Sequence, residues 1–285
     1  MTSNLKPYDQ VRVVSDRFWK EGAPRGTIGY IVEAYPDGAL EVEVSSKDGT
    51  TVAQFVAREE DLELAEPRGG ATKSLGQGYL AKPPSGRGPG VLVLHPWWGL
   101  TDFVRGVCDR LAEEGFVVFA PDLYHGPTAA TIKEAERLES TLTIAQIRTD
   151  LALAVIELRA QPGVADHSLG LIGFSLGAFH GLELAAERGV DFGAVVVYYG
   201  ARDAAYEKAH AAFLGHFAET DPYASDAEVK EFEERLRAAG REVTIHVYPG
   251  TGHWFFEEDR KDAYNPEAAR LSWDRTIAFL KKQLR

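Results

Sequence analysis

Residues 173–177 read Gly-Phe-Ser-Leu-Gly, and the chain on either side of them predicts a strand that runs straight into a helix. Apolar residues from Leu169 to Ile172 are typical of a short buried strand, and helical spacing of apolar residues follows over 176–188. Gly-x-Ser-x-Gly between a strand and a helix is the pattern of a nucleophile elbow, a strained turn that holds a serine hydroxyl clear of a sheet. Ser175 would then stand at the start of a helix, where free backbone N–H groups stabilise developing negative charge.

The region from Gly76 onward alternates strands with helices, as a parallel sheet covered by helices on both faces requires. The run from Val91 to Leu94 is apolar throughout, which is typical of a strand buried on both faces. Strands are expected at 78–81, 91–95, 116–120, 168–174, 194–199, 211–217 and 242–248. Helices are expected at 102–114, 132–161 (with a break inside), 176–188, 226–239 and 266–282. The predicted fold class is therefore α/β, with a doubly wound, mostly parallel sheet.

Residues 1–66 predict a smaller all-β unit, built from short strands and tight turns. Leu40, Val42 and Val44 alternate with glutamates between turn signals at 36–38 and 47–49. This pattern predicts a small closed or nearly closed barrel. It resembles the SH3-like barrels of a small bacterial domain family, and that resemblance implies the fold alone. We predict a β-barrel domain at 1–66, a linker at 67–75 and an α/β domain at 76–285.

The composition excludes several classes of function. A formal net charge of -12 argues against nucleic-acid binding, which depends on basic groups that neutralise phosphates. No segment is apolar for long enough to span a bilayer, and residues 1–10 are too polar for a signal peptide, so we expect a cytoplasmic protein without membrane association. Cys108 is the only cysteine, which excludes an internal disulfide and predicts a buried, unreactive thiol within a helix.

A serine hydroxyl needs a base to take its proton at neutral pH, and a histidine oriented by a carboxylate can serve as that base. Among the 8 histidines, those beyond the strand that follows the elbow are His210, His216, His246 and His253. His253 lies in a glycine-rich loop directly after a strand, where the catalytic residues of open α/β sheets collect. We therefore expect His253 to be the base.

The carboxylate that orients the histidine must follow a strand between Ser175 and His253. Asp221 lies just beyond the strand expected at 211–217, and the proline behind it stiffens the turn. Asp221 is therefore favoured as the acid. Glu219 and Asp226 are the alternatives that the sequence leaves open.

Hydrolysis of an ester also needs two backbone N–H donors for the oxyanion of the tetrahedral intermediate. One is expected from Leu176, the residue after the serine, and the other from the loop that begins with His95. Pro96 has no N–H, so the backbone of Trp97 is the best candidate. The adjacent Trp97 and Trp98 at a strand's end also predict one wall of a pocket.

Taken together, these segments resemble the dienelactone hydrolase family over nearly all of residues 76–285, in the family's order. The matching motifs are 91–100 with its His-Pro-Trp-Trp-Gly, Ala-Pro-Asp-Leu-Tyr at 120–124, the elbow at 173–177, Asp221, and Gly-His at 252–253. The resemblance implies an α/β-hydrolase without a large cap domain. Carried over by position, the triad is Ser175, Asp221 and His253, with backbone oxyanion donors at Trp97 and Leu176. It implies hydrolysis of small carboxylic esters or lactones through an acyl-enzyme, without a metal or an organic cofactor.

Departures from the founding members of that family bear on the substrate. Those enzymes have a cysteine at the elbow, where this chain has Ser175, and a glutamate where it has Pro96. Their arginines that hold a substrate carboxylate have no match, because Glu257 occupies the expected region. We therefore expect a neutral, fairly apolar ester or lactone in a pocket of aromatic side chains. The pocket residues predicted are Trp98, Tyr124, Trp254 and Phe255.

Two other functions stay open on the sequence alone. A hydrolase of short acyl-peptides would use the same triad, although no site for a peptide's charged terminus is evident. A non-catalytic binding module would instead use the N-terminal barrel to recruit a partner. The sequence is compatible with a homo-oligomer and does not fix the oligomeric state.

Overall fold

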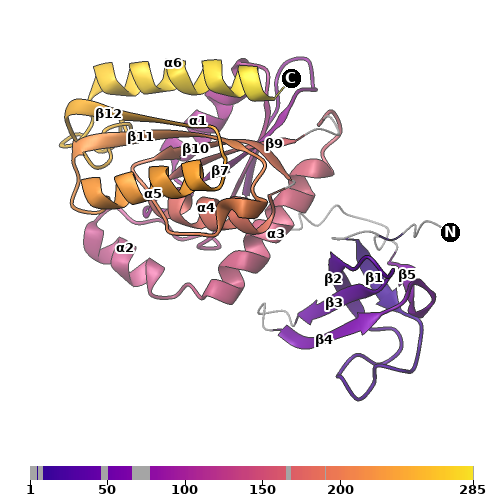
Figure 1. Ribbon diagram of the computed structural model, residues 1–285. Coiled ribbons are helices and arrows are strands. Elements are labelled where there is room, and N and C mark those ends of the chain that lie inside the picture. Colours follow the sequence, from indigo (N-terminus) through magenta and orange to yellow (C-terminus); the bar gives the residue numbers. More distant parts are fainter. Residues whose placement is uncertain are drawn as a thin grey trace. The chain divides into compact units, whose positions relative to one another are not determined.

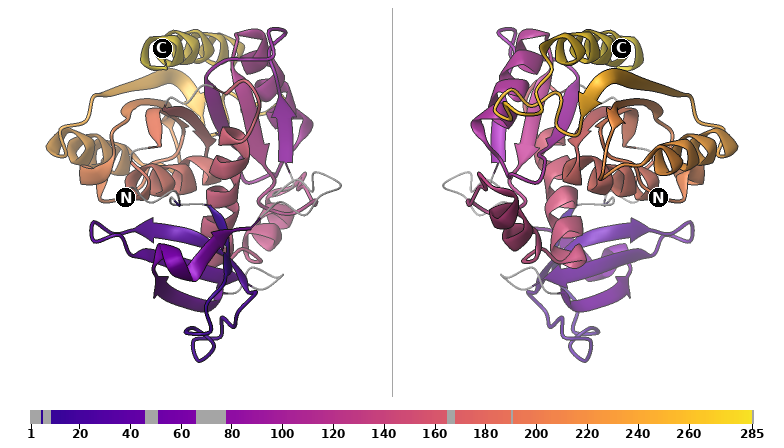
Figure 2. Two further views of the ribbon diagram at one scale, coloured as in Figure 1. Left: turned by 90° about the vertical axis from the view of Figure 1, so that its right-hand side faces the viewer. Right: turned by 90° about the vertical axis from the view of Figure 1, so that its left-hand side faces the viewer.

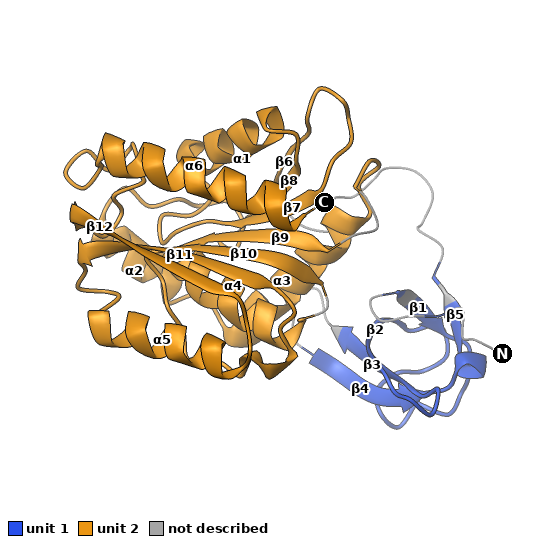
Figure 3. Ribbon diagram, turned by 45° about the horizontal axis from the view of Figure 1, so that its top comes forward, with its two compact units in different colours: residues 1–73 blue, residues 74–285 orange. Residues whose placement is uncertain are grey.

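The chain forms two compact units, Met1–Lys73 and Ser74–Arg285, in the computed structural model (Figure 3). The structure describes residues 5, 9–45, 51–65, 78–164, 168–189 and 191–284. The predicted linker at 67–75 lies outside the described residues.

The first unit is an antiparallel sheet in the order β4-β3-β2-β1-β5. Its strands are β1 (Gln10–Val13), β2 (Ile28–Ala34), β3 (Leu40–Ser45), β4 (Thr51–Ala57) and β5 (Leu62–Leu64), and the short 3₁₀ helix η1 (Glu59–Asp61) precedes β5. Leu40, Val42 and Val44 lie in its core, as their alternation predicted.

The sheet of this unit curls into a half-barrel, and the predicted all-β class of the unit is confirmed. Within the described residues, β4 pairs only with β3 and β5 pairs only with β1. No register pairs β5 with β4 in the described residues, and these two strands are the edges of the sheet. Both edges therefore stay open in the described part of the unit.

The second unit contains a seven-stranded sheet in the order β12-β11-β10-β9-β7-β8-β6. All neighbouring strands are parallel except β6, which runs antiparallel to β8. The strands are β6 (Gly78–Ala81), β7 (Gly90–Leu94), β8 (Val117–Pro121), β9 (Leu169–Phe174), β10 (Phe192–Tyr198), β11 (Ala212–Thr220) and β12 (Val243–Gly252). The helices are α1 (Asp102–Glu113), α2 (Ile132–Glu139), α3 (Ile144–Arg159), α4 (Leu176–Glu187), α5 (Asp226–Ala238) and α6 (Pro266–Gln283), with the 3₁₀ helix η2 (Tyr206–Lys208).

Helices cover both faces of this sheet, which confirms the predicted doubly wound α/β class (Figures 1 and 2). Side chains such as Val93 and Ile172 face the layer of α1 and α6, and they form one hydrophobic core with it. Their neighbours Leu92 and Leu171 face α3, α4 and α5 and form the second core. Continuously apolar strands are required because every strand residue meets one of the two layers.

Three details of the unit position the site. The predicted helix at 132–161 is interrupted, because Thr143 begins a new helix by accepting a hydrogen bond from the Gln146 N–H at 3.1 Å. The strand expected at 211–217 continues to Thr220, so Asp221 follows it immediately. In the same way β12 continues to Gly252, so His253 is the first residue after that strand.

Cys108 is completely buried in α1, as predicted for an unreactive thiol. Burial raises the pKa of this thiol far above its usual value, so the thiolate does not form at neutral pH. Within the described residues, no helix has both the length and the apolar character needed to cross a membrane.

Candidate active site

Ser175 occupies a strained turn between β9 and α4. Its backbone has φ 49° and ψ -111°, a left-handed conformation that non-glycine residues rarely adopt, and its N–H donates to the Tyr198 carbonyl at 3.0 Å. The turn needs its two glycines. A Cβ on Gly173 would stand 2.7 Å from the Ala178 nitrogen, and one on Gly177 would stand 2.6 Å from the His95 carbonyl oxygen. The Gly-x-Ser-x-Gly motif is therefore a steric requirement of this strand–turn–helix junction.

The imidazole of His253 lies between Ser175 and Asp221. Its Nε2 is 2.9 Å from Ser175 Oγ, and its Nδ1 is 2.7 Å and 2.8 Å from the two carboxylate oxygens of Asp221. A carboxylate only accepts, so Nδ1 carries the proton and Nε2 is free to accept the proton of the serine hydroxyl. The His253 and Asp221 side chains are 3% and 2% exposed, so water competes little for these hydrogen bonds.

Backbone groups fix the Asp221 carboxylate. Its Oδ1 accepts hydrogen bonds from the N–H of Tyr223 at 2.8 Å and of Ala224 at 3.1 Å. Glu219, the first alternative, instead accepts from the Gly250 N–H at 2.9 Å and so braces the loop before His253. Asp226, the second alternative, is the exposed first residue of α5. The structure therefore brings Asp221, and neither alternative, to the histidine.

The other candidate histidines do not face Ser175. His216 is completely buried, with Nδ1 2.8 Å from the Tyr248 hydroxyl and Nε2 3.0 Å from the Thr276 hydroxyl, and burial lowers its pKa. His246 lies on β12 with its ring 6.0 Å from that of His216. His210 is an exposed residue before β11, at the opposite end of that strand from Asp221.

The predicted oxyanion donors are the backbone N–H groups of Leu176 and Trp97, which belong to neighbouring segments of the sheet edge. Leu176 is the first residue of α4, and Trp97 follows β7, which neighbours β9 in the sheet. Within the described ranges, neither N–H has a hydrogen-bond partner. The close approach of Gly177 to the Leu94 and His95 carbonyls packs the start of α4 against the end of β7. Both donors are thus available at the same edge of the sheet.

A pocket of about 760 Å³ opens beside His253. Trp98 and Trp254 line it, as predicted, with their rings 5.2 Å apart. Tyr124 does not line it. That side chain is buried behind the pocket, and its hydroxyl donates to the Trp97 carbonyl at 3.1 Å. Tyr124 therefore supports the loop that carries Trp97.

Phe255 was predicted to line the pocket, and the structure corrects that prediction. Its side chain is completely buried in the core beneath α1 and α6, with its ring 5.0 Å from Tyr248 and 5.6 Å from Tyr199. Trp254 has φ 66°, so the chain turns sharply after His253 and directs the next side chain inward. A ring without a polar atom favours that apolar interior.

Tyr223 and Arg260 are among the pocket residues that the sequence analysis did not predict, and both contact predicted site residues. The Tyr223 ring lies 4.9 Å from the His253 ring, and the Arg260 guanidinium lies 3.7 Å from the centroid of the Trp98 ring. The sequence could have predicted Tyr223, because it lies two residues after Asp221 in the loop that follows the same strand. No sequence pattern predicts Arg260, because only the folding of the loop after β12 brings it to Trp98.

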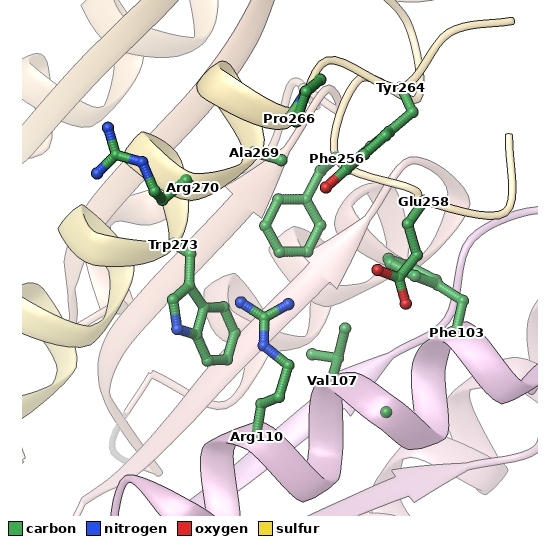
Figure 4. A pocket seen from close by; sticks show the side chains of 11 residues that line it. Phe103, Val107, Arg110, Phe256, Glu258, Tyr264, Pro266, Ala269, Arg270 and Trp273 are labelled. Carbon is green, nitrogen blue, oxygen red and sulfur yellow. The ribbon is translucent and has the colours of Figure 1, made fainter. Parts of the chain in front are cut away.

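A separate cavity of about 160 Å³ lies between α1, α6 and the loop after β12 (Figure 4). Arg110, Glu258 and Trp273 are among its lining residues, and no member of the Ser175–His253–Asp221 set is. Of these three residues, His253 lines the 760 Å³ pocket.

Glu257 is a completely buried carboxyl group close to His253. The Tyr199 hydroxyl donates to its Oε1 at 2.8 Å, and the Tyr199 ring lies 4.9 Å from the His253 ring. Its Oε2 has no partner within the described residues. Burial raises the pKa of Glu257 to about 8, so this carboxyl is protonated at neutral pH.

From the raised pKa of Glu257 we predict how the free energy of unfolding depends on pH. Between pH 4.5, the usual value for glutamate, and pH 8, the folded state holds a proton that the unfolded state has lost, so the free energy of unfolding falls as pH rises. Glu257→Gln removes this loss, and we expect the variant to gain roughly 3 to 5 kcal/mol over the wild type between pH 5 and pH 9. Urea unfolding across that range measures it. Glu258→Gln, the exposed neighbour, is the control, and parallel curves for Glu257→Gln and the wild type would refute the prediction.

Comparisons with known proteins show the family to which the second unit is similar. The model of the dienelactone hydrolase family matches residues 77–284. Protein usf of Aquifex pyrophilus is 33% identical over 221 residues, which cover 73% of this chain and 94% of that protein. The carboxymethylenebutenolidase of Pseudomonas sp. (strain P51) is 29% identical over 218 residues, 72% of this chain and 89% of that enzyme. A Klebsiella pneumoniae protein of known structure is 27% identical with a TM-score of 0.66, over 74% of this chain and 97% of that one.

Proposed function

The chain belongs to the dienelactone hydrolase family of hydrolases, and from that membership we propose that it cleaves small carboxylic esters or lactones with Ser175 as the nucleophile. The observation that carries the proposal is the 2.9 Å separation of Ser175 Oγ and His253 Nε2, with Asp221 behind the imidazole. An uncharged serine oxygen attacks poorly, and this arrangement supplies the base that activates it.

In the proposed mechanism Ser175 Oγ attacks the substrate carbonyl carbon while His253 Nε2 takes the hydroxyl proton. The negative charge passes to the carbonyl oxygen, which the N–H groups of Leu176 and Trp97 stabilise. Collapse of this intermediate breaks the bond to the leaving alkoxide, which receives the proton from His253. A water molecule, activated by the same imidazole, then hydrolyses the acyl-enzyme and restores Ser175.

A fluorophosphonate probe tests the nucleophile directly, since it reacts only with activated serines. We expect it to label Ser175, located by peptide mapping, and we expect no labelling of the Ser175→Ala variant. Ser168→Ala is a matched control, because Ser168 is exposed at the other end of β9. A folded wild-type protein that stays unlabelled would refute the proposed chemistry and favour a non-catalytic binding module.

The aromatic side of the pocket supports the proposed substrate class. Trp98, Trp254 and Tyr223 provide apolar surface next to His253, which suits a neutral acyl or alcohol group, and charged residues of both signs, Asp259, Arg260, Lys261 and Asp262, line the same pocket. A panel of p-nitrophenyl esters, lactones and N-acyl peptides separates the alternatives. We expect turnover of short neutral esters and lactones, whereas turnover confined to the peptides would assign the pocket to acyl-peptide hydrolysis.

A further inference from the structure

His95 is a completely buried histidine at the end of β7, in the loop that carries Trp97. The Leu123 backbone N–H lies 3.1 Å from its Nε2, and the Pro96 carbonyl oxygen lies 2.8 Å from its Nδ1. A backbone N–H only donates and a carbonyl only accepts. Nε2 must therefore be unprotonated, and Nδ1 must carry the hydrogen that it donates to Pro96. The two contacts together fix one neutral tautomer.

The hydrogen bond to Pro96 also sets the direction of the next N–H. The Pro96–Trp97 peptide is planar and trans, so its C=O and N–H point in opposite directions. The Pro96 oxygen accepts from His95 Nδ1 and, at 3.1 Å, from the Gly99 N–H. Two donors therefore hold this carbonyl on one side of the loop, and the Trp97 N–H is directed to the other side.

The same loop lies against the start of α4. A Cβ on Gly177 would stand 2.6 Å from the His95 carbonyl oxygen, so the backbone of His95 and the first turn of α4 are in close contact. That turn begins with Leu176, the other backbone donor of the proposed oxyanion hole. Rotation of the Pro96–Trp97 peptide would therefore change the direction of the Trp97 N–H relative to that of Leu176.

We propose that His95 is a positioning residue that locks the Pro96–Trp97 peptide with its N–H directed at the oxyanion. The inference rests on the proposed serine hydrolase function. Burial lowers the pKa of His95, which keeps the imidazole neutral and preserves the acceptor that Leu123 requires. Among the described residues, Asp122, the Tyr124 ring at 5.2 Å and His180 are ring or charged groups near it, and His95 does not line the 760 Å³ pocket.

Two substitutions separate the donor of His95 from its acceptor. In His95→Asn the amide nitrogen can take the place of Nδ1, so the hydrogen bond to Pro96 is kept and that from Leu123 is lost. In His95→Gln the amide oxygen can take the place of Nε2, so the hydrogen bond from Leu123 is kept and that to Pro96 is lost. Both variants replace a buried ring by a smaller side chain, so a purely packing role predicts similar losses in both.

The measurement is kcat and KM on a p-nitrophenyl ester, per active site titrated with the fluorophosphonate. We expect His95→Gln to lower kcat by about 10²-fold with KM within a few-fold, the size of losing one oxyanion donor. We expect His95→Asn to stay within about tenfold of the wild type, as the kept donor implies. Equal kcat values for the two variants would overturn the proposal, while an unlabelled, inactive wild type would overturn the proposed function itself.

The tautomer gives a second test that needs neither variant to fold. Nitrogen-15 shifts of the His95 imidazole in the wild-type protein should report a protonated Nδ1 and an unprotonated Nε2. The opposite tautomer would break the link between His95 and the Pro96 carbonyl, and so overturn the proposal even in an active enzyme.

Discussion

Ser175→Ala and His253→Ala are each expected to lower kcat for ester hydrolysis by about 10⁶-fold, and the double variant by no more than either alone. The reason is that the two side chains act as one unit. Without His253 the serine hydroxyl keeps its proton, and without Ser175 the imidazole has no nucleophile to activate, so the second substitution removes nothing further.

The measurement is single-turnover and steady-state hydrolysis of a p-nitrophenyl ester by the three variants. Ser168→Ala and His210→Gln are matched controls, and both should keep wild-type kcat. Each residue is exposed and precedes a strand, β9 or β11, at the end of that strand that lies away from the elbow. If the fold-decrease in kcat of the double variant equalled the product of the two single decreases, Ser175 and His253 would act independently. That outcome would contradict the shared proton transfer.

The sequence was sufficient to predict the layers of the α/β unit and the place of its reactive side chains. Strands such as 91–94 meet helices on both faces and are apolar throughout, so local composition is enough to predict that they are buried. Ser175, Asp221 and His253 each follow a parallel strand, and the carboxyl ends of parallel strands lie at one edge of a sheet. Sequence order therefore predicts that they share this edge, whereas the choice of Asp221 over Glu219 needed the hydrogen bonds of the structure.

What could not be predicted depends on contacts between distant segments. Whether the N-terminal sheet closes depends on whether its edge strands β4 and β5 pair with each other, a contact that no local pattern encodes. Arg260 reaches Trp98 across more than 150 residues of chain, through a loop whose path follows its packing. Phe255 was misplaced because composition shows an aromatic residue next to His253 but not the turn at Trp254 that directs it inward.

Asp221→Asn is expected to lower kcat by about 10⁴-fold while leaving the fold intact, because the substitution changes the tautomer of His253 and little else. The N–H groups of Tyr223 and Ala224 both donate to Oδ1, so the asparagine oxygen takes that position. The amide nitrogen then replaces Oδ2, which lies 2.7 Å from His253 Nδ1. A donor at that distance favours the imidazole with its proton on Nε2, and this tautomer has no lone pair to accept the serine proton.

The alternatives for the acid supply the controls for this experiment. Glu219→Gln keeps an oxygen for the Gly250 N–H, and Asp226→Asn changes only an exposed residue of α5, so kcat should stay within about tenfold of the wild type in both. Thermal unfolding confirms that each variant is folded, and kcat against pH reports the base. A loss near 10⁴-fold in Glu219→Gln with an active Asp221→Asn would move the acid to Glu219, which would require the loop after β11 to rearrange in the working enzyme.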